Sequence, residues 1–236
     1  MDVVEQIREL IVKVENKIKE LQNAVNSVLG RIPGWASWVA DKIHSAWDTM
    51  CAQVDKFWAT VTSFSLNMGE PWTLSSTASS WSDNVGGPVS AEVQVAEAGN
   101  LATDDAWSGT AADQYRQRIS LHKSALDKIK STLTDGISGV LDTIQKGIWT
   151  FWGSLVVALA ALVTGIIGAI ASTATIFGAP AGPFIAGGAV LVCAAAITGG
   201  TLILKSSCQS AKTTLEQKVN DNAAFLDGHW PAGALT

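Results

Sequence analysis

GIWTFWGSLVVALAALVTGIIGAIASTATIFGAPAGPFIAGGAVLVCAAAITGGTLIL, residues 147–204, is the stretch of sequence that decides the fold. Its 58 residues include no Asp, Glu, Lys, Arg or His, and Lys146 and Lys205 flank it. Only 16% of the whole chain is charged, against roughly a quarter in typical soluble domains. An ordinary soluble globule does not fit, because so long an uncharged stretch would leave a large apolar surface in water.

The uncharged stretch has the lengths of two membrane spans. Residues 149–174 contain no proline, Pro180 and Pro183 interrupt the stretch with the glycines beside them, and 184–204 form a second apolar run. About 20 apolar residues cross a bilayer as a helix, so the sequence predicts a transmembrane-like helical hairpin with both ends on one side. Trp149 and Trp152 stand at the start of the first span, where amphipathic rings favour the membrane interface.

Small side chains recur at helical spacing in both halves of this hairpin. Where lipid supplies no hydrophobic drive between helices, small residues allow close helix packing. The candidate membrane-inserting or helix-packing residues are therefore Trp149, Trp152, Gly165, Gly168, Ala169, Gly199 and Gly200.

The segments outside the hairpin have the periodicity of amphipathic helices. In 1–66, apolar residues alternate in steps of three and four, and Gly30, Pro33 and Gly34 break the pattern into a helical hairpin. The region 67–146 is read as short helical pieces with a turn at 86–88, followed by one long helix that runs into the uncharged stretch.

The sequence thus predicts an all-α, elongated helical bundle in four segments. These are an N-terminal amphipathic helical hairpin (1–66), a helical region (67–146), the apolar helical hairpin (147–204) and a C-terminal helix and tail (205–236). Three settings of the hairpin stay open: burial inside a soluble bundle, a resident membrane protein, and a protein made soluble that inserts later. The third is favoured, because the amphipathic helices have too little free apolar surface to shield the hairpin.

One short motif carries a family resemblance. Trp107-Ser108-Gly109, followed by Ala111-Ala112-Asp113-Gln114-Tyr115, resembles the WXG motif of the type VII secretion substrates of Gram-positive bacteria. In that family the tripeptide forms the turn of a helical hairpin, and pairs of hairpins dimerise. The resemblance implies that Trp107 and Gly109 form a turn, with the glycine allowing a tight reversal and the aromatic ring anchoring the corner.

Export by this route implies a partner. The family's Y-x-x-x-D/E export element is absent, because Tyr115 is the only tyrosine and Ile119 stands at the acidic position. The resemblance therefore implies a WXG-family partner that supplies the signal. Met1 to Leu10 has no basic region followed by an apolar core, so we expect secretion without a cleavable signal peptide. The helical pattern is also similar, by architecture alone, to the α-helical pore-forming toxins.

Several chemistries are not expected. The net charge of −5 and the scattered basic residues argue against nucleic-acid binding. His44, His122 and His229 lie far apart without metal-ligand spacing, and neither a nucleophile elbow nor a phosphate-binding loop occurs, so we expect no metal, no cofactor and no enzyme activity.

The favoured hypothesis is a secreted WXG-like protein that becomes membrane-associated, inserts its apolar hairpin in lipid and forms a homo-oligomer that makes a pore or lesion. The alternatives are a non-lytic secretion partner or chaperone that buries the hairpin against another protein, and a structural protein that self-assembles through the N-terminal hairpin.

Overall fold

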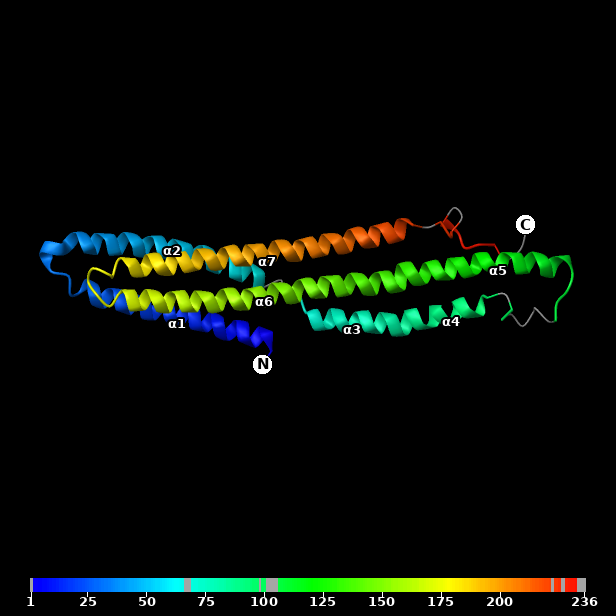
Figure 1. Cartoon of the computed structure of the whole chain (residues 1–236), viewed down its shortest axis with the longest axis horizontal. Helices are drawn as coiled ribbons and strands as arrows, with labels where there is room; N and C mark the ends of the chain where they lie inside the picture. The colour runs from blue at the N-terminus through cyan, green and yellow to red at the C-terminus, as the bar shows by residue number, and fades with distance from the viewer. Residues whose placement is uncertain are drawn as a thin grey trace. The chain divides into compact units, whose positions relative to one another are not determined.

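The computed structural model describes residues 2–65, 69–97, 99–100, 106–221, 223–225 and 228–232, and this part of the chain is helical without a β-strand (Figure 1). Its long helices are α1 (Val3–Leu29), α2 (Ser37–Ser65), α5 (Thr110–Ile129), α6 (Asp135–Ser172) and α7 (Ala181–Asn220). The shorter elements are η1 (Gly34–Ala36), α3 (Pro71–Trp81), η2 (Ser82–Gly86), α4 (Gly87–Val95) and η3 (Lys130–Thr134). The predicted all-α fold is confirmed.

The helices belong to two compact units. The first comprises Met1–Gly69 and Ile148–Leu204, and the second comprises Glu70–Gly147 and Lys205–Thr236. Each of α6 and α7 therefore has residues in both units. The first unit contains almost the entire uncharged stretch, so this unit is the setting of the apolar hairpin.

In the first unit, α1 and α2 form a helical hairpin. The Asp2 carboxylate accepts a hydrogen bond from the Val4 backbone N–H at 3.3 Å and so caps the start of α1. Pro33 precedes η1, and η1 runs directly into α2. The residues buried on these elements keep helical spacing: Ile7, Val14, Leu21, Val25 and Val28 on α1, and Ala36, Val39, Ile43, Ala46, Met50, Phe57 and Val61 on η1 and α2.

The apolar hairpin is formed by the part of α6 after Gly147 and the part of α7 before Lys205. The turn between them occupies 173–180, and its start is marked by the Thr173 hydroxyl, which donates to the Ile170 carbonyl at 2.7 Å. The sequence predicted the interruption at Pro180 and Pro183 with the glycines beside them, whereas the turn starts earlier in the chain and ends before Pro183. α7 begins earlier, at Ala181, because Pro183 falls in its first turn, where no N–H is required of it.

In the second unit, α3, η2 and α4 lie along α5, η3 and the first turns of α6. The predicted turn at 86–88 is instead a π-helical segment: the Gly87 N–H bonds to the Ser82 carbonyl five residues back, and the chain continues into α4. Pro88 lies in the first turn of α4, where a proline costs no helical hydrogen bond. The Trp81 indole Nε1–H donates to the Leu133 carbonyl at 2.8 Å and joins η3 to this segment.

Candidate membrane-interaction surface

One face of the apolar hairpin is the core of the first unit. On α6 the buried side chains follow a helical stripe, and α7 presents a matching set. These residues are Phe151, Trp152, Leu155, Ala158, Leu159, Leu162, Ile166 and Ala169 on α6, and Ala186, Val190, Cys193 and Ile197 on α7. In Figure 1, α1 and α2 run alongside this part of α6 and α7, so the inner face of the hairpin is covered by amphipathic helices.

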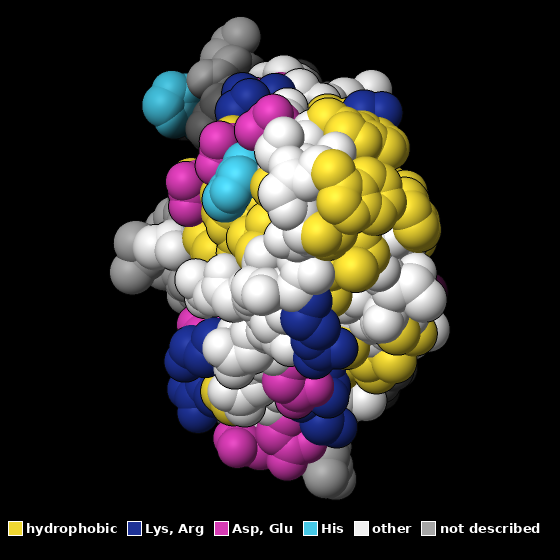
Figure 2. Space-filling model, turned by 90° about the vertical axis from the view of Figure 1, so that its left-hand side faces the viewer, with side chains coloured by type: hydrophobic (Ala, Val, Ile, Leu, Met, Phe, Trp, Pro, Cys, Tyr) yellow, Lys and Arg dark blue, Asp and Glu magenta, His cyan; other side chains and the backbone are white. Residues whose placement is uncertain are grey.

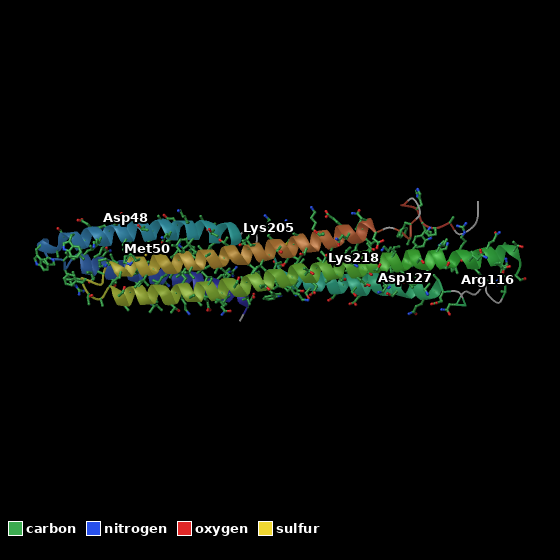
Figure 3. All side chains as sticks on the ribbon, turned by 45° about the horizontal axis from the view of Figure 1, so that its top comes forward. Asp48, Met50, Arg116, Asp127, Lys205 and Lys218 are labelled. Atoms are coloured by element: carbon green, nitrogen blue, oxygen red, sulfur yellow. The ribbon has the colours of Figure 1, made fainter. Side chains whose placement is uncertain are left out.

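The contact between α2 and α7 is close and polar at one point. A Cβ at Gly187 would lie 3.8 Å from the Met50 Cα and would overlap the Gln53 side-chain oxygen. Met50 is buried on this side of α2, whereas Asp48 is exposed on another side (Figure 3). The buried Gln53 Oε1 has no hydrogen-bond partner among the described residues. An unpaired buried acceptor costs about 1–3 kcal/mol, so it weakens the packing of α2 on the hairpin.

A titratable thiol lies beside this contact on α2. Burial raises the pKa of the Cys51 thiol above its ordinary value of 9.0, and the negative charges of Asp55 and Asp48 raise it further. All three causes disfavour the thiolate, because burial removes water and the carboxylates repel a second negative charge. Cys51 is therefore a poor nucleophile at neutral pH.

Three of the predicted small packing residues are packed against other residues of the first unit. A Cβ at Gly165 would overlap the Ala189 methyl group, so α6 and α7 approach each other closely there. A Cβ at Gly200 would lie 2.8 Å from the Ser154 hydroxyl oxygen and 2.9 Å from the Phe151 ring. Ala169 is fully buried. The small side chains at these positions serve contacts within the hairpin.

The other two predicted glycines face outward. A Cβ built on Gly168 or on Gly199 would meet no atom of the described residues within 4 Å. These two positions, one on each helix of the hairpin, are open to a contact from outside the unit.

The outer face of the hairpin is apolar and exposed. The most apolar 18-residue window of the long helix ending at Ser172 is only 33% buried, and that of α7 only 28%. Val157 and Val192 are 69% and 68% exposed, and Ile167, Leu191, Leu202 and Ile203 are exposed with them. Both helices are long and apolar enough to cross a membrane. An exposed apolar face of this length is available for contact with lipid or with another protein.

Aromatic residues mark the start of this hairpin. The Trp149 and Trp152 rings meet edge to face, with centroids 5.6 Å apart and planes at 73°. Trp152 is buried in the first unit, and Trp149 is partly exposed. The structure therefore places Trp149 at the surface and Trp152 in the core.

A second aromatic cluster lies at the turn of the hairpin. Trp38 of α2 and Phe177 and Phe184 of the hairpin line one groove, so the turn after α1 and the turn between α6 and α7 meet. Trp35 is 77% exposed and Phe177 is 71% exposed. Figure 2 views this end and shows a hydrophobic patch with basic side chains at its border. We name Trp35, Trp38, Phe177 and Phe184 the aromatic tip.

Sequence reasoning missed the aromatic tip. Trp35 and Trp38 stand three residues apart, off the buried stripe of Ala36, Val39 and Ile43. That offset is a signal of exposure, but the meeting of the two turns depends on tertiary packing.

The tripeptide Trp107-Ser108-Gly109 leads directly into α5 in the second unit. Gly109 has a φ of 106°, a conformation that favours glycine, and it caps the start of α5. The centroids of the Trp107 and Tyr115 rings are 5.7 Å apart. The Arg116 guanidinium donates a hydrogen bond to the Trp107 carbonyl at 2.8 Å. α4 precedes this segment, and Lys123 of α5 pairs with Glu97 at 2.9 Å, so the end of α4 lies beside α5.

The comparisons identify no relative. No family model, no curated protein and no solved structure matches the chain. Within the described residues, no group of three or more His, Cys, Asp or Glu side chains is placed to hold a metal ion.

Proposed function

We propose that the chain is a secreted, WXG-like protein that inserts its apolar hairpin in a membrane and oligomerises there to make a pore or lesion. The observation that carries the proposal is the outer face of the hairpin, which is uncharged, apolar and exposed along both helices. Exposed apolar surface of this extent marks a site for lipid or for another protein.

The mechanism begins with release of the hairpin from α1 and α2. These two helices carry charged side chains, such as Asp48 of α2, that a bilayer core would disfavour. A spanning hairpin must therefore part from them. The unpaired Gln53 oxygen at the α2–α7 contact favours parting, because in the open state water would satisfy it.

Oligomerisation follows through the outward glycines. Gly168 and Gly199 have open space before them, and helices in lipid associate through small residues that let their backbones approach. Gly165, Ala169 and Gly200 pack between the two helices of the hairpin, so they keep α6 and α7 together when the hairpin leaves α1 and α2.

The secretion part of the proposal is supported by the local geometry of Trp107-Ser108-Gly109. A glycine at positive φ between two helical segments is what the WXG resemblance implies. The lack of a Y-x-x-x-D/E element at Tyr115 makes a WXG-family partner part of this proposal.

The test measures dye release from loaded liposomes by the full chain and by two variants. Val157→Glu with Val192→Glu places carboxylates on the outer face, where a charge in a bilayer costs about 3 kcal/mol each. Both sites are exposed, so the folded bundle is expected to keep its thermal midpoint, while leakage falls at least tenfold, as that cost requires.

Val12→Glu on α1 is the matched control, because Val12 is also an exposed valine but lies outside the hairpin. It should leak dye as the parent chain does. Equal leakage from the double variant would contradict insertion through the outer face. A parent chain that releases no dye and forms a discrete complex with another secretion substrate would favour the non-lytic partner instead.

A further inference from the structure

The aromatic tip is built by two turns that are far apart in the sequence. Trp35 and Trp38 come from the connection between α1 and α2, and Phe177 and Phe184 come from the turn of the apolar hairpin. A groove lined by Trp38, Lys42, Phe177 and Phe184 joins the two. Only the second pair belongs to the hairpin, so the first pair needs an explanation of its own.

The composition of the tip fits a lipid interface. Tryptophan rings favour the headgroup level of a bilayer, where one part of the ring is apolar and the other is wet. The Lys42 ammonium lies 5.0 Å from the centre of the Trp38 ring, which places a cation beside an aromatic face. Residues 173–180 carry no ionisable side chain, so this turn meets no charge penalty at an interface.

The local charge points to anionic lipid. Arg31 and Lys42 flank the aromatic pair and Asp41 is the acidic residue between them, so residues 31–42 are net basic in a chain of net charge −5. Each basic residue near an anionic surface strengthens binding by roughly fivefold.

The shape of the tip favours lipid over a protein partner. Trp35 and Phe177 are each more than 70% exposed, so their rings project from the end of the unit. A protein partner would need cavities that match these rings, whereas a fluid interface accommodates them. Phe184 also begins the exposed face that continues through Ile185, Leu191 and Val192 along α7.

We infer that the aromatic tip docks the chain on the interface of an anionic bilayer before the hairpin inserts. The two tryptophans of the α1–α2 connection act as anchors in this step, and they deliver the hairpin with its turn toward the lipid. This inference rests on the proposed function, because it assigns the first step of membrane insertion.

The test measures vesicle flotation and dye release together, with vesicles of phosphatidylcholine and phosphatidylglycerol. Trp35→Ser with Trp38→Ser removes both anchors from exposed positions, and Phe177→Ser with Phe184→Ser does the same on the other turn. Trp72→Ser is the matched control, because Trp72 is an exposed tryptophan of α3, in the second unit. We expect each tip variant to lose vesicle binding by at least about tenfold and the control to bind as the parent does.

The outcomes separate this inference from the proposed function. Undiminished binding by both tip variants would overturn tip docking, and continued dye release would then leave insertion standing. Binding that depends on the tip without dye release would support docking and contradict insertion. A parent chain that binds no vesicles, or whose molar mass in lipid-free buffer falls in the tip variants, would overturn the inference in favour of a contact between copies.

Discussion

At the scale of single residues, the glycines of the hairpin divide into two kinds that the structure distinguishes. Gly165→Ala should destabilise the first unit by about 1–3 kcal/mol, because its Cβ overlaps Ala189 in a packed contact. Gly168→Ala should stabilise it by roughly 0.4–1 kcal/mol, since it adds helix propensity in open space. Chemical denaturation of both variants measures the difference. Equal effects from the two substitutions would show that the α6–α7 contact at Gly165 is looser than described.

Cys51 gives a pH-dependent prediction. Burial, with Asp55 and Asp48 nearby, raises its thiol pKa, so alkylation of Cys51 should still be accelerating above pH 9.0. The folded state favours the neutral thiol. The contribution of the Cys51 thiol to the free energy of unfolding is therefore fully present below pH 9.0. This contribution is lost as the pH rises through the higher pKa of the thiol in the folded state. Mass spectrometry after timed iodoacetamide labelling follows the rate. Asp48→Asn should raise the rate only slightly, because burial is the largest cause.

At the scale of elements, the packing of α2 on α7 should hold the hairpin until a membrane releases it. Met50→Cys with Gly187→Cys places two thiols where α2 and α7 lie close together, and Gln53→Ala makes room for them. With Cys51, Cys193 and Cys208 replaced, the oxidised chain should not release liposome dye, and reduction should restore release. Leakage at the same rate in both redox states would show that the hairpin acts without leaving α2.

The elements also show where local sequence signals suffice. The Asp2 cap and the break around Pro33 bound α1 through contacts a few residues away, and the apolar spacing of 1–66 predicted the hairpin of α1 and α2. The turn expected at 86–88 was wrong, because Pro88 fits the first turn of α4 and a π-helical segment absorbs the change. A proline marks a break only where its missing N–H is needed, and the distinction depends on helical register.

At the scale of the whole molecule, the outward glycines should govern assembly on lipid. Gly168→Leu with Gly199→Leu fills open space at both positions, so the lipid-free chain should keep its fold and its molar mass. On liposomes the double variant should lose most of the rise in molar mass that we expect of the parent chain, because the added side chains hold neighbouring backbones apart. Light scattering of detergent extracts measures the mass. If the double variant showed the full rise in molar mass and the full dye leakage of the parent chain, assembly through small residues would be contradicted.

The sequence by itself determined the helical class and the position of the apolar hairpin. Both depend on local information: the periodicity of apolar side chains sets the helices, and the uncharged run between Lys146 and Lys205 sets the hairpin. Gly109 takes a positive φ at the start of α5, a local property that glycine allows.

The tertiary structure alone decided which face of the hairpin is covered and which is free. Gly165 and Gly168 are three residues apart on one helix, yet a Cβ on the first would overlap Ala189, whereas a Cβ on the second would meet no atom of the described residues within 4 Å. The aromatic tip likewise forms only when two distant turns meet. The spacing of residues in the sequence predicts which of them share a helix face. The partner that covers this face is set by long-range packing, because many helix arrangements bury a similar apolar area.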